Sequence, residues 1–352
     1  MGPLTFDYHR LRARSAIAAV ACVALGLSAA TAQAGSILNV DVQNYIIVYE
    51  GNLGHTLSIN NFGTPGDRVW NGDIGIAGTG KLQATGPGTL NGSINFAAGD
   101  SNQAGISNTT INGSVNYGVG YTQTIMNNMN TLSYILGQQA GSGTSLVINT
   151  SSDQTVLAST GSLQSITGGG VGSGSVFRLF NVTSVNSGNG ENLIIKADSN
   201  TNVVLDVNTP GDAQFHGNIL LQDLSGKFFG DSGYAGITPD QLLVNLYGGS
   251  ALVGGDKLDA NNNGNDAHPA NIIYGTFLDP NGAISMVNTR FTGRVFGGDT
   301  TNMQIVSGDT IDLPPGGGGG SSQPTPLPAS VWTGLTLMGA LGVAYRLRRR
   351  SV

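Results

Sequence analysis

Apolar residues in this chain come in short runs that are separated by residues typical of turns. The runs are rich in Val, Ile, Leu and Phe, and Gly, Asn, Asp or Ser stand at their ends. Many short strands with turn residues between them indicate an all-β architecture. The clearest runs are residues 145–149, 155–159, 175–182, 192–197, 202–207, 218–222, 241–246 and 271–277.

A repeated Asn-Gly dipeptide gives the strands a period. It occurs at Asn71, Asn91 and Asn112, so the unit is about 20 residues long, which is typical of stacked solenoid coils. Asn-Gly is also common in ordinary β-hairpins, so a β-sandwich is the alternative. The even spacing favours a right-handed β-solenoid, similar to a β-helix, that extends over residues 35–313.

One segment departs from the strand pattern. Its apolar residues Ile125, Met126, Met129, Leu132 and Leu136 recur at helical spacing. This periodicity predicts an amphipathic helix over about residues 122–138. We expect the helix to cover one side of the stacked strands.

The first 34 residues have the features of a secretory signal peptide. A basic start precedes an almost wholly apolar run, and Ala32 and Ala34 form an A-x-A cleavage site before Gly35. The only cysteine, Cys22, lies within this segment. We therefore expect export, and a mature chain without disulfides or a cysteine nucleophile.

The last residues form a second targeting segment, residues 326–352, after a Gly/Ser/Pro linker at 314–325. Its apolar run, 331–345, is shorter than the roughly 20 residues that span a bilayer comfortably. Basic residues that follow such a run resist translocation. The segment therefore predicts a short transmembrane stop, and a permanent C-terminal anchor is the alternative. The basic residues are Arg346, Arg348, Arg349 and Arg350.

The residues before the apolar run match a known type of sorting motif in four positions. Pro326, Leu327, Pro328 and Ala329 resemble the VPLPA variant of the PEP-CTERM sorting signal of Gram-negative bacteria, with Thr325 in place of the Val. The resemblance implies sorting by an exosortase-type membrane protease. It also implies delivery to the cell surface, the outer membrane or an extracellular biofilm matrix.

A second resemblance covers residues 37–313. The stretch 275–311 is similar to the closing coils of the choice-of-anchor A family, although Asp279 stands where a small residue is expected. The family resemblance implies an exported, β-helix-like adhesive or matrix module. The matching positions are Gly275, Thr276, Leu278, Pro280, Asn281, Gly293, Val295 and Gly297.

Charge excludes one class of partner. Without the two terminal segments, eight Lys and Arg stand against 20 Asp and Glu, which gives a net charge of −12. Nucleic-acid binding needs clustered Lys and Arg. The acidic body lacks such clusters, so nucleic acid is not an expected partner.

A possible calcium loop is the only cofactor site that the sequence suggests. Asp259, Asn261, Asn263 and Gly264 match the first half of a D-x-[DN]-x-[DN]-G loop, and Asp256 and Asp266 could add oxygen ligands. The twelfth position is Ala270, where a bidentate Glu is needed. An ordinary polar loop explains the same residues, so we assign no cofactor.

The sequence contains no recognised catalytic motif, and we expect a non-catalytic structural or adhesive surface protein. A β-helix polysaccharide lyase or another carbohydrate-active enzyme is the first alternative, with Arg290 and Arg294 close to Asp279 and Asp299 in the sequence. A solvated strand face explains these charges as well. An ice- or crystal-binding face is the second alternative, but Thr109-Thr110 and Thr300-Thr301 do not extend into a regular T-x-T ladder. Extracellular polysaccharide or another surface polymer is the partner that we expect.

Overall fold

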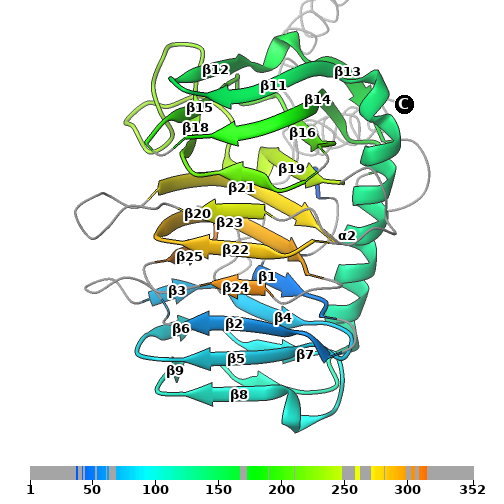
Figure 1. The fold of residues 1–352 in the computed structure, drawn as a ribbon, viewed down its shortest axis with the longest axis vertical. Helices are drawn as coiled ribbons and strands as arrows, with labels where there is room; N and C mark the ends of the chain where they lie inside the picture. Colours follow the sequence, from blue (N-terminus) through cyan, green and yellow to red (C-terminus); the bar gives the residue numbers. More distant parts are fainter. Residues whose placement is uncertain are drawn as a thin grey trace, which may run out of the picture. The chain divides into compact units, whose positions relative to one another are not determined.

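The strands of the body stack into a β-solenoid (Figure 1), here seen in a computed structural model. Apart from β13 (Ser162–Ser165), which runs antiparallel to β14, the described strands pair in parallel. The predicted solenoid with one flanking helix is therefore confirmed, and the sandwich alternative is wrong. The structure describes residues 37–38, 42, 44–51, 54–60, 62, 69–166, 173–188, 190–209, 211–247, 258–261, 271–280, 282–298, 303–305 and 309–314.

Each coil contributes strands to three faces, named here by what lies on them. The front face has nine layers. From the lower end in Figure 1 upward these are β8 (Ala104–Ser107), β5 (Lys81–Thr85), β2 (Thr56–Asn60), β24 (Met303–Ile305), β22 (Ile284–Val287), β20 (Leu258–Asn261), β17 (Ala213–Phe215) and the C-terminal halves of β14 (Val176–Ser187) and β11 (Thr144–Thr150).

The asparagine face follows the front face along each coil. Its strands, in the same upward order, are β9 (Thr110–Ile111), β6 (Thr89–Asn91), β3 (Val69–Asn71), β25 (Thr310–Asp312), the first halves of β23 (Thr289–Gly297) and β21 (Asn271–Asp279), β18 (Asn218–Gln222), β15 (Asn192–Lys196) and β12 (Gln154–Leu157).

The helix-covered face completes the coil. It contains β10 (Val115–Asn116), β7 (Ile94–Phe96), β4 (Asp73–Ile76), β1 (Tyr45–Tyr49), the second halves of β23 and β21, β19 (Leu242–Leu246), β16 (Val203–Val207) and the first half of β14. Short 3-10 helices lie between strands at Ser101–Gln103, Ala140–Ser142, Ala158–Thr160 and Pro239–Gln241.

The chain does not wind from one end of the stack to the other. Strand β1 lies in the middle, between β4 and β23, so the first coils build downward and the last coils return to the same place. Helix α2 (Gly120–Gln139) connects the two halves. Its 20 residues span about 30 Å, which equals roughly six strand layers. In agreement, α2 contacts β7, β4, β1, β23, β21 and β19, which are successive layers of one face.

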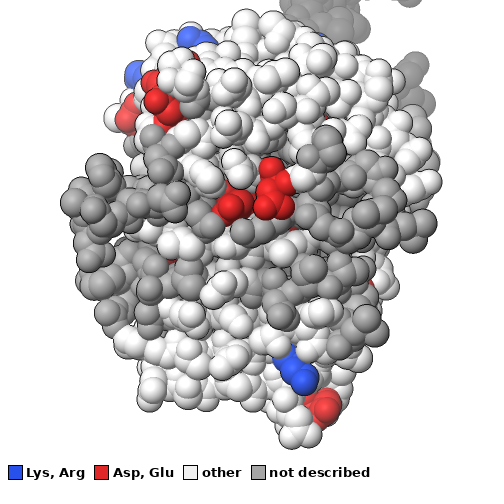
Figure 2. All heavy atoms as spheres, viewed as in Figure 1, with Lys and Arg blue, Asp and Glu red and all other residues white. Residues whose placement is uncertain are grey.

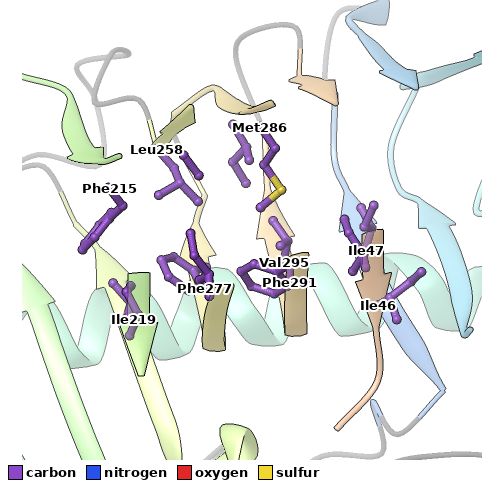
Figure 3. Packing of buried hydrophobic residues seen from close by; sticks show 14 of the residues in the cluster. Ile46, Ile47, Phe215, Ile219, Leu258, Phe277, Met286, Phe291 and Val295 are labelled. Carbon is purple, nitrogen blue, oxygen red and sulfur yellow. The ribbon is translucent and has the colours of Figure 1, made fainter. Parts of the chain in front are cut away.

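Two apolar cores result. The first fills the inside of the coils, where side chains from successive layers stack, including Phe215, Phe277 and Phe291 (Figure 3). The second lies between α2 and the helix-covered face and contains Met126, Met129 and other α2 residues. The predicted helix is thus confirmed, with two more residues at its start and one more at its end.

Glycines make the corner between two faces on β21 and β23. Gly275 and Gly293 are paired in register, at φ values of 134° and 155°. A Cβ on Gly293 would meet the carbonyl oxygen of Gly275, so this close approach of two strands excludes a side chain.

Candidate binding surface

The front face carries one outward polar position in almost every layer. Ser58 and Gln83 are in register on β2 and β5, while Leu57, Ile59, Leu82 and Ala84 beside them are buried. This alternation is the period of a strand with one buried face. The in-register positions continue over all nine layers and are named here the front column. From top to bottom they are Asn149, Asn186, Gln214, Asp259, Ser285, Gln304, Ser58, Gln83 and Gly105.

The front column is almost without charge. Seven of its nine members are Asn, Gln or Ser, and Asp259 is its one ionisable residue. In Figure 2, uncharged residues cover most of the described surface on this side, and a small group of acidic atoms lies near its middle. Hydroxyls and amides can both donate and accept hydrogen bonds. With a strand spacing of about 4.8 Å, the column is a regular row of such groups.

A shallow groove of about 390 Å³ lies at the lower end of this face. Thr56, Lys81, Gln83, Thr85 and Ser107 line it together with Gln103. The Gln103 amide is buried and donates to the carbonyl of Gly80. Lys81 is exposed and brings a positive charge to the groove. The groove therefore offers polar contacts and one cation.

The three repeated asparagines are stacked at equivalent places in their coils, as their spacing predicts: Asn71 and Asn91 end β3 and β6, and Asn112 directly follows β9. The Asn91 amide donates to Oδ1 of Asn71 at 3.0 Å, and the Asn112 amide donates to Oδ1 of Asn91 at 2.6 Å. Asn71 in turn donates to the Asp312 carboxylate at 2.8 Å. The ladder joins the first coils to the last ones across 241 residues of sequence. The asparagine ladder therefore stabilises the stack of coils.

The helix-covered face contains polar groups that are closed to a ligand. Asn245 donates to the Asp206 carboxylate at 2.6 Å and to the carbonyl of Ser133 on α2 at 3.1 Å. The Ser133 hydroxyl donates back to Oδ1 of Asn245 at 2.6 Å. All three residues are buried, and burial raises the pKa of Asp206 to about 7. These contacts attach the helix to the strands.

The residues of the lyase alternative do not form one site. Arg290 is exposed on the asparagine face, whereas Arg294 lies beyond the corner at Gly293 and is 3% exposed. Arg294 forms an ion pair with Asp240 and donates to the carbonyl of Val42, and burial lowers its pKa to about 10. Asp279 is buried at the end of β21, and Asp299 lies outside the described residues. The structure therefore does not bring the two arginines together.

The suggested calcium loop is described only in part. Asp259 and Asn261 belong to β20, and the Asp259 carboxylate lies 3.7 Å from Nε2 of His216. Asp256, Asn263, Gly264, Asp266 and Ala270 lie outside the described residues. Within the described part of the chain, no group of three or more His, Cys, Asp or Glu side chains could hold a metal ion.

Both terminal segments also lie outside the described residues. This holds for Ala32, Ala34 and Gly35, and for the sorting motif 326–329, the apolar run 331–345 and the arginines that follow. Among the helices that the structure does describe, none has the length and apolar character needed to cross a membrane. The predicted targeting segments remain predictions.

Comparison with known proteins gives structural likenesses alone. No family model matches the sequence, and no curated protein matches it. A crystal structure of an ice-binding protein from an Antarctic biological consortium is 11% identical, with a TM-score of 0.47, over 80% of this chain and 92% of that one. The ice-binding protein LeIBP of an Arctic yeast is 11% identical, with a TM-score of 0.43, over 83% of this chain and 99% of that one.

Proposed function

We propose that this chain is an exported, non-catalytic surface or matrix protein whose front face contacts an extracellular polymer. The observation that carries the proposal is the front column, which has an outward polar side chain in eight of its nine layers. Each contact of this kind is weak. A regular row makes many of them at once, which suits a repeating polymer better than a small substrate.

Polysaccharide is the polymer class that this chemistry favours. Its hydroxyl groups donate and accept hydrogen bonds, as the Asn, Gln and Ser side chains of the column do. Lys81 in the lower groove adds a contact for an acidic sugar. The acidic body, with a net charge of −12, adds a possible dependence on calcium for acidic chains.

A binding and cleavage assay tests this proposal against the lyase alternative. The purified protein is incubated with neutral and acidic polysaccharides, with and without calcium. We expect co-sedimentation with at least one polymer, and no release of unsaturated oligosaccharides that absorb ultraviolet light. Release of such products by the parent protein, abolished by Arg290→Ala on the exposed surface, would show that the protein is an enzyme and contradict the proposal.

Export and sorting are tested separately, on protein extracted from the cell surface. The paired terminal segments motivate the expectation that the mature chain begins near Gly35 and is processed after residues 326–329. Mass spectrometry reads both ends directly. A surface form that retains an intact tail to Val352 would contradict exosortase-type sorting.

Ice binding is a second candidate because of one feature of the asparagine face. Thr89 and Asn91 stand two residues apart on β6, and Thr110 and Asn112 are stacked on them in the next layer. Thr and Asn thereby form two short parallel columns. Thermal hysteresis that disappears in Thr89→Tyr and Thr110→Tyr would support this candidate, and its absence from the parent protein would exclude it.

A further inference from the structure

The lower end of the solenoid is an open strand edge. Its last layer consists of β8, β9 and β10, and each pairs upward with β5, β6 or β7. Among the described strands, none pairs with the other side of this layer. Unpaired backbone N–H and C=O groups at such an edge are a template for another strand.

Among the residues that the structure describes, nothing closes the apolar core at this end. Ala104, Ile106, Ile111 and Val115 point into the coil, but each is partly exposed. Their in-register neighbours one layer higher are Leu82, Ala84, Leu90 and Ile94, at 1% exposure or less. A solenoid normally closes its core with a polar terminal repeat. In the described residues, the lower layer has apolar positions where a cap would place polar ones.

The three strands of the lower layer lack the charges that usually protect an edge. The sequence contains no Asp, Glu, Lys, Arg or Pro from residue 101 to residue 152, which includes the whole lower layer. Natural edge strands are commonly blunted by such residues. The exposed Asp100 stands directly before this segment, so the lower end has few charges, and two copies can meet there with less like-charge repulsion than the acidic body as a whole would give.

We infer that two copies of this chain associate through their lower ends, with β8 of one copy antiparallel to β8 of the other about a two-fold axis. The two-fold arrangement uses the same surface on both copies and closes as a dimer. A head-to-tail stack would place the lower end of one copy on the upper end of the next. The upper end suits this less well, because its layer contains β13, which runs antiparallel to β14 and so interrupts the parallel arrangement. Such a dimer presents two front faces and doubles the row available to a polymer, although the inference does not depend on polymer binding.

Single cysteines test this geometry, because Cys22 is the only native thiol. In the full chain with Cys22→Ser, one variant carries Gly105→Cys on β8. A matched control carries Gly141→Cys in the 3-10 helix that follows α2. A Cβ at Gly105 would approach only the Leu82 carbonyl, at 3.5 Å, and a Cβ at Gly141 meets nothing within 4 Å. Both substitutions should therefore be tolerated.

With a short thiol-specific cross-linker, we expect a species of doubled mass for Gly105→Cys and none for the control. Adding Ser107→Lys brings two like charges together at the edge and should abolish the doubled species. Cross-linking only in a mixture of the two variants would indicate head-to-tail stacking and contradict the inference. Absence of cross-linking at Gly105, with a single-chain mass in sedimentation at all concentrations, would also overturn it. Both outcomes are independent of the polysaccharide assay.

Discussion

At the scale of single residues, the buried Asp206 links pH to the stability of the fold. Its carboxylate lies between the helix-covered face and α2 and accepts a hydrogen bond from Asn245. Burial disfavours the charged form and raises the pKa from 3.8 to about 7. The folded protein therefore holds a proton that the unfolded chain has already lost between these two values.

We expect the contribution of Asp206 to the free energy of unfolding to be largest below about pH 4 and to decrease as the pH rises toward 7. The decrease from this one group is at most about 1.4 kcal/mol per pH unit, and it levels off above its folded pKa. Asp206→Asn should remove this component, since an amide can still accept from Asn245. Denaturant unfolding from pH 4 to 8 measures it, with the exposed Asp212→Asn as the control. Equal pH slopes for Asp206→Asn and the parent would contradict the assignment.

The asparagine ladder gives a second expectation at this scale. Asn91 donates one side-chain hydrogen bond in the ladder and accepts another, whereas Asn112 at its end donates one. At about 0.5–1.5 kcal/mol for each bond, Asn91→Ala should destabilise the protein about twice as much as Asn112→Ala. Urea unfolding of the two variants tests this ratio, and an equal loss would mean that the additional hydrogen bond of Asn91 does not stabilise the protein.

At the scale of elements, α2 covers one face of the solenoid. Ile125, Met126, Met129, Leu132 and Leu136 are all buried against the helix-covered face. Their helical spacing in the sequence was sufficient to predict this, because an amphipathic pattern reports which side is buried. The spacing could not show which strands they would meet.

Met129→Asp tests the covering role of the helix. It places an unpaired charge in the core below α2, so we expect a loss of at least about 3 kcal/mol in the free energy of unfolding. Asn127→Asp, on the exposed side of the same helix, should change it by no more than about 0.5 kcal/mol. Thermal or denaturant unfolding of both variants provides the comparison. A similar loss for the two would show that α2 does not pack as described.

At the scale of the whole molecule, the sequence predicts the single coil of the solenoid better than the order in which the coils stack. The Asn-Gly period identified the stacked coils because those residues repeat locally. The insertion of β1 between β4 and β23 depends on pairing between residues about 250 positions apart, such as Ile47 with Val295, and no local pattern reports this. The front column was missed for the same reason. Its members are unremarkable in sequence and become a row only when distant strands lie in register.

Binding of the polymer by the front column is the central claim, and two pairs of substitutions test it most directly. Gln83→Ala with Gln304→Ala removes two exposed amides from it, and Gln138→Ala with Gln164→Ala removes two amides elsewhere as a matched control. The affinity for the polysaccharide with which the parent protein co-sediments is measured for all three proteins. Loss of two hydrogen bonds should weaken binding by the front-column variant about tenfold, and the control should bind like the parent. Equal binding by the front-column variant and the parent, or a loss confined to the control, would contradict the proposal that this face contacts the polymer.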